Sequence, residues 1–210
     1  MISVLIADDH TVVRQGLKHI LSSDSQLRVV GEATNGDEVL SMVETLNVDS
    51  VVLDITMPGK NGLDVLKELK RKHPQLPVLV LSMHPEDQFA IRVLKAGASG
   101  YVTKESAPDE LINALRKVCG GGKYVSPQLA EKLAVFIQHN QPGALHEQLS
   151  DREYQVMIML SLGKTVSEIA DELMLSIKTV STYRTRVLQK MRMATNAELT
   201  RYALQNQLVH

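Results

Sequence analysis

The sequence has a single cysteine and no run of 18 uninterrupted apolar residues. One cysteine cannot form a disulfide within the chain, which suits a reducing compartment. A membrane-spanning helix needs about 20 apolar residues. A secretory signal starts with basic residues before an apolar segment, whereas this chain starts with a strand-like run that leads into acids. We therefore expect a soluble, cytoplasmic protein without a membrane partner.

Two phosphate-binding loops are also missing. The motif Gly-x-x-x-x-Gly-Lys-Ser/Thr does not occur, which excludes a P-loop nucleotide enzyme. No glycine-rich loop follows the first strand-like run, which argues against a flavodoxin-like carrier of a cofactor.

The 210 residues are 44% apolar, enough for two domains with their own cores. The net charge of −1 is unevenly distributed between the two ends of the chain. Residues 149–210 carry 8 basic against 6 acidic side chains, and residues 1–148 carry 15 against 18. The front of the chain is mildly acidic and its tail mildly basic.

Strand and helix patterns alternate five times in the first 120 residues. Strands are expected at 2–7, 27–33, 51–54, 77–81 and 100–102, and helices at 11–21, 35–46, 62–72, 85–95 and 108–119. This alternation predicts an α/β fold with a doubly wound five-stranded parallel sheet. The second strand is the more polar one, which places it at or near an edge.

Polar side chains stand where the expected strands end: Asp8, Asp9, Asp54, Ser82 and Lys104. Alone, an Asp after a strand usually caps a turn, a Ser caps a helix, and a Lys is solvated. Parallel strands, however, bring their carboxyl ends to one edge, where open α/β sheets bind ligands. The joint placement therefore predicts a site.

Three neighbouring carboxylates repel one another unless a cation joins them. Oxygen ligands favour Mg²⁺, and zinc is disfavoured because His10 is the only imidazole nearby and no cysteine is close. Beside such an ion Asp54, central in the sheet, can act as nucleophile on a phosphoryl group. Ser82 and Lys104 can then bind its oxygens.

The pattern resembles the flavodoxin-like receiver domain of two-component response regulators. The residues that carry the resemblance are Asp8, Asp9, Asp54, Met57, Pro58, Gly62, Ser82, Ala96, Gly97, Ala98 and Lys104. It implies that a sensor histidine kinase phosphorylates Asp54. It also implies Mg²⁺ held by Asp9, Asp54 and the Thr56 carbonyl, with Asp8 assisting through water.

The same resemblance implies that Ser82 and Tyr101 form a switch pair. The hydroxyl would move toward the phosphoryl group while the ring turns inward. It links Thr56 and His84 to the lifetime of the acyl phosphate. Glu105 stands where many receivers carry Pro, and a cis bond before Glu would cost about 2.5–4 kcal/mol, so the sequence leaves this loop's geometry open.

Three glycines, 120–122, mark the end of the receiver, which we predict to span residues 1–122. Residues 123–148 form the predicted linker. It begins with a helical stripe from Ser126 to Ile137 and continues as a polar tether to about Gln148.

Residues 149–210 contain three Ser/Thr-x-x-Glu helix-start signatures, at Ser150, Thr165 and Thr195, and a further cap at Ser176. They predict an all-α domain of four helices at about 151–161, 166–174, 177–191 and 196–206. The short connection before Ile177 makes the middle pair a helix-turn-helix.

The third of these helices has one face without acids. Between Ser176 and Arg192 there are five basic residues and no acid. The face opposite the apolar stripe carries Lys178, Ser181, Thr182, Thr185, Arg186 and Gln189. Such a face suits the DNA major groove, and a solvated basic face on a protein-binding bundle is the alternative.

The tail resembles the LuxR-type helix-turn-helix through residues 149–153, Gly163, residues 168–170, Leu173, Ser176 and the run Lys178-Thr179-Val180. Joined to a receiver, it resembles the NarL/FixJ class of response regulators. Ser181 stands where Lys is frequent, and Tyr183 where His is. The resemblance implies a regulator of transcription that binds double-stranded promoter DNA. Phosphorylation would favour a homodimer or release the DNA-binding helix.

An enzyme is the competing class, because Asp, Ser and Lys on successive strand ends also resemble the haloacid dehalogenase phosphatases. Those enzymes need a second Asp two residues after the nucleophile, where Thr56 stands. We therefore expect a phosphoacceptor with at most slow autodephosphorylation, not an enzyme.

Overall fold

The computed structural model describes residues 1–57, 60–83, 86–127, 129–131, 133, 144–206 and 208–209, except the side chains of 86–89. The chain divides into two compact units, Met1–Leu133 and Ala134–His210, which we describe separately. No helix among the described residues is long and apolar enough to cross a membrane.

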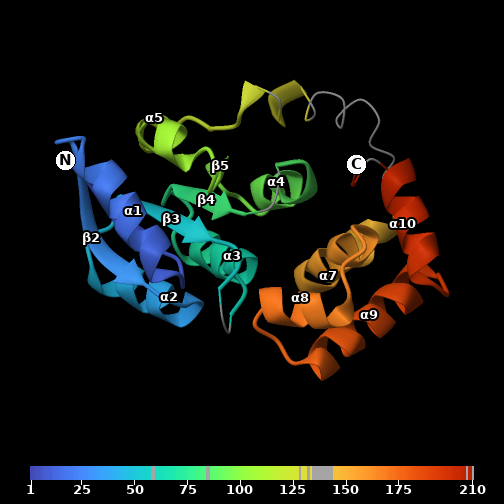
Figure 1. Ribbon diagram of the computed structural model, residues 1–210. Helices are drawn as coiled ribbons and strands as arrows, with labels where there is room; N and C mark the ends of the chain where they lie inside the picture. Colours follow the sequence, from blue (N-terminus) through green and yellow to red (C-terminus); the bar gives the residue numbers. More distant parts are fainter. Residues whose placement is uncertain are drawn as a thin grey trace. The chain divides into compact units, whose positions relative to one another are not determined.

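The first unit is built on a five-stranded parallel sheet. Its strands are β1 (Ile2–Ala7), β2 (Leu27–Ala33), β3 (Ser50–Asp54), β4 (Val78–Ser82) and β5 (Gly100–Thr103). They lie in the order β2-β1-β3-β4-β5 (Figure 1). Every residue of β3 and β4 is buried, as expected for central parallel strands. The predicted fold class is confirmed, and β2 is an edge strand.

Helices cover both faces of this sheet. They are α1 (Thr11–Ser22), α2 (Gly36–Thr45), α3 (Gly62–Lys72), α4 (Glu86–Lys95) and α5 (Ala107–Cys119). α1 and α5 pack together on one face, and α2 and α3 are neighbours on the other (Figure 1). The α1 and α5 side buries a core that includes Ile6, Leu21, Leu81, Val102 and Leu115. This packing fixes the strand ends from which the acids project.

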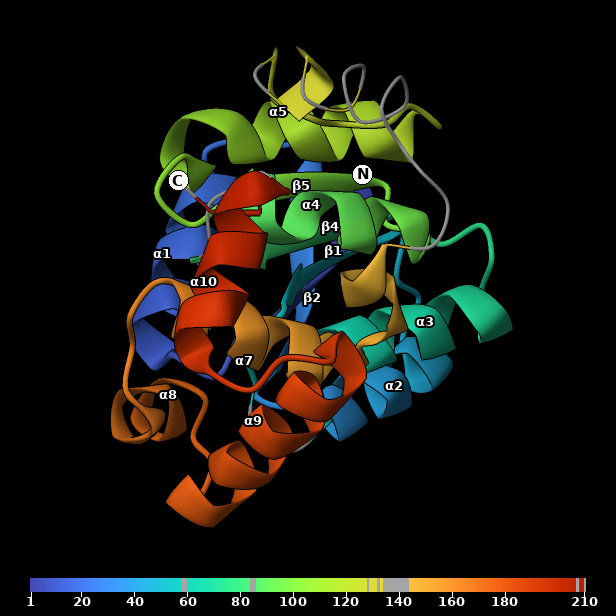
Figure 2. The same ribbon diagram turned by 90° about the vertical axis from the view of Figure 1, so that its right-hand side faces the viewer.

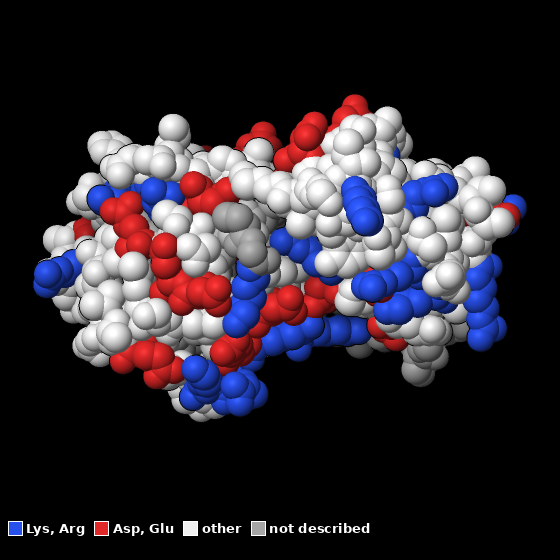
Figure 3. All heavy atoms as spheres, turned by 90° about the horizontal axis from the view of Figure 1, so that it is seen from below, with Lys and Arg blue, Asp and Glu red and all other residues white. Residues whose placement is uncertain are grey.

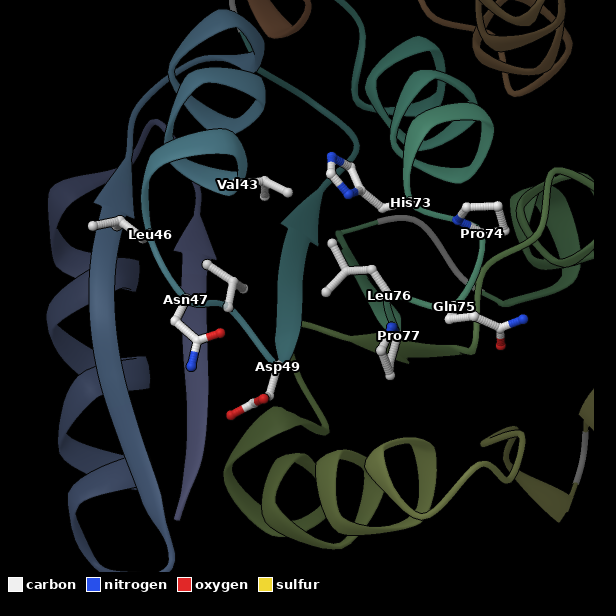
Figure 4. Close-up of a pocket in the computed structure, with 10 residues that line it drawn as sticks. Val43, Leu46, Asn47, Asp49, His73, Pro74, Gln75, Leu76 and Pro77 are labelled. Atoms are coloured by element: carbon white, nitrogen blue, oxygen red, sulfur yellow. The ribbon is translucent and has the colours of Figure 1, made fainter.

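The amino-terminal edge of the sheet carries a hollow of roughly 480 Å³. Figure 4 shows its lining, which comes from the end of α2 and from the segments before β3 and β4. One carboxylate lies there, that of Asp49, whose Oδ2 accepts a hydrogen bond of 2.8 Å from the Ser3 amide. The reactive side chains predicted from the sequence lie at the other end of the strands.

The second unit is helical. It contains the short 3-10 helix η1 (Leu145–Gln148) and the helices α7 (Asp151–Ser161), α8 (Val166–Glu172), α9 (Ile177–Met191) and α10 (Asn196–Gln205). α7 packs against α9 and α10, and α8 lies against α9 (Figure 2). Ser150, Thr165 and Thr195 each form a complete capping box, and the Ser176 side chain caps α9.

Two details differ from the sequence prediction. α8 ends at Glu172 rather than at residue 174, because Met174 takes a left-handed conformation with φ 52° and the Leu175 amide donates back to the Ala170 carbonyl. Residues 145–148, expected in a tether, form η1, where His146 Nδ1 lies 2.9 Å from the Tyr202 hydroxyl. Half of the linker helix predicted from Ser126 to Ile137 lies outside the described residues.

Candidate phosphoacceptor site and DNA-binding helix

Asp8, Asp54 and Lys104 meet at the carboxyl end of the sheet. The two aspartates are 0% and 1% exposed. Lys104 Nζ lies 2.6 Å from Asp8 Oδ2 and 2.7 Å from Asp54 Oδ2. One ammonium group thus serves two buried carboxylates, so the cluster keeps a net negative charge that suits a further cation.

The backbone around Asp54 is fixed by the start of α3. The Thr56 amide donates a 3.0 Å hydrogen bond to Asp54 Oδ1, and the Gly62 amide donates to the Ile55 carbonyl at 3.1 Å. A Cβ on Gly62 would lie 2.3 Å from the Asp54 carbonyl oxygen. Only glycine lets the helix approach the strand end this closely.

Asp9 lies beside its neighbour His10. His10 Nδ1 is 2.9 Å from Asp9 Oδ1 and 3.3 Å from Asp8 Oδ1. The Arg14 guanidinium donates a 2.8 Å hydrogen bond to the Asp8 carbonyl and holds this corner of the chain. Sequence reasoning missed Arg14, although its place one turn into α1, after the acids, was a usable signal.

Burial shifts the pKa of the central acid. Desolvation, with help from the nearby Asp8 charge and against the pull of Lys104, raises the pKa of Asp54 to about 6. Burial also opposes charge on Lys104, but its contacts with Asp54 and Asp8 outweigh this and raise the pKa of Lys104. At neutral pH Asp54 is therefore mostly ionised and able to act as a nucleophile.

The donor set fits a hard divalent cation. One ligand atom from each of Asp8, Asp9, His10 and Asp54 lies within 4.8 Å of the others. Among the described residues this is the one such group. Three of the four donors are carboxylates, and carboxylate oxygens are what Mg²⁺ prefers.

The predicted switch residues belong to β4 and β5. Ser82 ends β4 fully buried, and its carbonyl accepts a 2.9 Å hydrogen bond from the Lys104 amide. Tyr101 is fully buried as well. The described residues include no cis peptide bond, so Lys104 reaches the acids through a trans Glu105 bond. Pro58 and His84 lie outside the described residues.

In the second unit, α9 exposes the face that the sequence predicts. Lys178, Ser181, Thr182, Thr185 and Arg186 are exposed, and Thr179 is half-buried. The opposite stripe packs inward through Val180, Val187 and Met191. Lys and Arg side chains are exposed at the right of Figure 3.

Two of the four basic residues of α9 stabilise the fold instead. Arg184 Nε donates to Asn196 Oδ1 at 2.8 Å, and Lys190 Nζ lies 2.6 Å from the buried Glu153 carboxylate. No hydrogen bond or ion pair with another described residue engages the charged groups of Lys178 and Arg186. Fewer basic groups are therefore available to a partner than the five basic residues between Ser176 and Arg192 suggested.

The two units match two family models. Residues 4–116 match the response regulator receiver domain, and residues 147–203 match the bacterial regulatory proteins of the luxR family. The chain belongs to the NarL/FixJ-class response regulators. This response regulator regulates transcription, and nothing in the comparisons supports the phosphatase alternative.

Similar curated proteins span the whole chain. The response regulator GacA of Pseudomonas aeruginosa is 39% identical over 210 residues, which are 100% of this chain and 98% of that protein. The response regulator UvrY of Escherichia coli is 36% identical over 209 residues, 99% of this chain and 96% of that protein.

Solved structures of RcsB are similar as well. RcsB in complex with DNA has a TM-score of 0.61 at 28% identity and covers 100% of this chain and 99% of its own. RcsB of Salmonella enterica serovar Typhimurium, bound to promoter rprA with the phosphomimetic BeF3⁻, has a TM-score of 0.63 at 28% identity and covers 96% and 97%.

Proposed function

We propose that Asp54 accepts a phosphoryl group from a sensor histidine kinase and that this charge controls promoter binding by α9. The observation that carries the proposal is the buried pair of acids, Asp8 and Asp54, sharing Lys104 at 2.6 and 2.7 Å. In this division residues 1–122 receive the signal, residues 123–148 connect, and residues 149–210 bind DNA. The chain acts in the cytoplasm, where it meets promoter DNA.

In the transfer step an oxygen of Asp54 attacks the phosphorus of the phosphohistidine. The new O–P bond forms as the P–N bond breaks, and the imidazole leaves with its electron pair. Asp9, Asp54 and the Thr56 carbonyl would hold Mg²⁺, with Asp8 assisting through water. The ion supplies charge neutralisation for phosphoryl oxygens.

Lys104 changes partners in this proposal. In the free protein it neutralises two carboxylates, and after transfer it pairs with a phosphoryl oxygen. Ser82 binds a second oxygen, and Tyr101 occupies the inward position that goes with it. A modification shifts such an equilibrium only by its differential free energy. The phosphorylated protein then forms the homodimer that engages two half-sites about one helical turn apart.

The acyl phosphate is expected to hydrolyse slowly, because Thr56 stands where a phosphatase would carry its second Asp. Thr56 offers no carboxyl to activate water. The chain therefore acts as a phosphoacceptor rather than as a catalyst of multiple turnovers.

Labelling with radioactive acetyl phosphate and Mg²⁺ tests the phosphoacceptor. We expect label on the wild type and none on Asp54→Asn. Asp64→Asn is the matched control, since Asp64 lies exposed on α3, and it should label normally. Full stoichiometric labelling of Asp54→Asn would refute the proposal.

The salt dependence of DNA affinity tests the second unit. Each phosphate contact contributes about 0.9 to the slope of log affinity against log salt concentration. Arg186→Ala should therefore reduce the slope by about one. Arg71→Ala, a change on α3 of the first unit, should leave it unchanged. A slope indifferent to Arg186 and Lys178 alike would favour a protein-binding tail.

A further inference from the structure

The hydroxyl groups of Thr182 and Thr185 on the exposed face of α9 are turned back to their own helix. Thr182 Oγ1 donates to the Lys178 carbonyl at 2.9 Å, and Thr185 Oγ1 donates to the Ser181 carbonyl at 3.0 Å. These bonds use the only hydrogen that each hydroxyl can donate. What each side chain presents outward is its methyl group, with the oxygen left as an acceptor.

An apolar side chain continues this methyl surface. Ile177, the first residue of α9, is 57% exposed. Positions 177, 181 and 185 follow one another at intervals of four along the helix, so they share a face. A single exposed Ile needs no explanation, but here it lines up through Ser181 with the methyl group of Thr185 on the acid-free face of the helix.

The donors that usually read guanine are absent from the centre of this face. Guanine is most often bound by a bidentate Arg or Lys, and Arg184 is committed to Asn196 Oδ1. Lys178 and Arg186 flank the threonines, where long basic side chains suit phosphates. At Thr182 and Thr185 the face therefore offers apolar contact and acceptors.

Resting on the proposed promoter binding, we infer that α9 reads thymine through its C5 methyl group. In the major groove thymine is the base that presents a methyl group, and threonine methyl groups and other apolar side chains contact it. Thr182 and Thr185 are the specificity-determining residues in this reading, and Ile177 extends the contact. The ligand is a half-site with thymines under the first three turns of α9.

The test first selects a binding site from random double-stranded DNA, using the full chain with beryllium fluoride and Mg²⁺. Each thymine of the selected site is then replaced by deoxyuridine, which removes only the methyl group. At contacted positions we expect affinity to fall about fourfold per methyl group, as follows from about 0.8 kcal/mol per buried carbon.

The matched variants are Thr182→Ser and Thr185→Ser, which keep the hydroxyl and its bond to the helix but lack the methyl group. In them the same uracil replacement should cost little, which a double-mutant cycle measures. Thr200→Ser on α10 is the control, because the Thr200 hydroxyl makes the same kind of bond, to the Asn196 carbonyl, away from α9.

Three outcomes would overturn the inference. If uracil is tolerated at every position, or if it weakens binding by the wild type and by both serine variants equally, the methyl contact is refuted while DNA binding remains intact. If no sequence is selected at all, the proposed promoter binding fails, and this inference falls with it.

Discussion

Each unit of this response regulator contains a buried carboxylate that faces one lysine, and the two sites differ in what else is present. In the first unit Lys104 lies 2.7 Å from Asp54 but also 2.6 Å from Asp8. In the second unit Lys190 lies 2.6 Å from Glu153, and the Ser150 amide donates to the same carboxylate at 2.8 Å. Lys104 thus pairs with two carboxylates, whereas Lys190 pairs with one.

The pKa shifts follow this difference. Burial raises the pKa of Asp54 to about 6, because one shared cation and one amide do not compensate for desolvation. Burial opposes charge on Glu153 too, but the bonds from Lys190 and Ser150 outweigh it and lower the pKa of Glu153. The Glu153 pair is satisfied within the fold, whereas the Asp54 cluster retains a demand for positive charge that Mg²⁺ can meet.

Removing Lys104 should change the free energy of unfolding more than any other substitution considered for the two carboxylate sites. Lys104→Ala leaves two buried carboxylates without their cation, which should lower the free energy of unfolding by about 3–5 kcal/mol in EDTA. Urea unfolding followed by circular dichroism measures it. Mg²⁺ should recover part of the loss.

Lys60→Ala is the matched control for that change. Lys60 Nζ lies 2.7 Å from Glu68, and both side chains are solvent-accessible, so its loss should be much smaller. Equal losses for the two lysine variants would show that burial does not distinguish these pairs.

The pH dependence of the stability of Asp54→Asn tests the same difference between the two carboxylate sites. The folded-state pKa of about 6 exceeds the ordinary value of 3.8, so protonation of Asp54 favours the folded state. That contribution is fully present below pH 3.8 and is lost as the pH rises through 6. In EDTA at pH 8, Asp54→Asn should therefore be more stable than the wild type by about 3 kcal/mol.

This gain should shrink as the pH falls from 6 toward 4. Asp64→Asn, on the exposed side of α3, is the matched control in the same unfolding measurements. A destabilised Asp54→Asn at pH 8 would mean that the bond to Lys104 outweighs the cost of burying the charge.

Features that depend only on residues close together in the sequence could be predicted from the sequence. The capping boxes at Ser150, Thr165 and Thr195 appear as predicted, because both partners lie within four residues. The strand ends could be predicted as well, since a parallel sheet requires its strands to point the same way.

Contacts between distant residues could not be predicted in this way. Nothing local indicates that Lys190 pairs with Glu153, 37 residues away, or that Arg184 binds Asn196 on the next helix. The same limit applies to α10. The helical spacing of Leu199, Ala203 and Leu204 fits a core and a dimer contact equally well, and only the packing shows that the first two are buried while Leu204 is 52% exposed.

Glu153→Gln is the smallest and most discriminating change. Gln at this position can still accept the hydrogen bonds of the capping box with Ser150, so the substitution removes only the charge that faces Lys190. Because the folded-state pKa of Glu153 is lowered, its contribution is present above the ordinary value of 4.5 and is lost as the pH falls through the folded value. The cost should be about 1 kcal/mol near pH 7, since Lys190 is 41% exposed and solvent screens the pair.

The stability differences of Glu153→Gln and Asp54→Asn from the wild type should therefore both shrink at low pH, but for opposite reasons. Toward pH 4 the Glu153 variant should approach the wild type because the wild type loses stability, while the Asp54 variant approaches it because the wild type gains. Hydrogen exchange of α7 amides in the full chain, compared between variant and wild type at each pH, measures the second unit by itself. A pH-independent difference would show that Lys190 contributes through packing of its methylene groups, and the contrast between the two carboxylates would then lie in geometry rather than in charge.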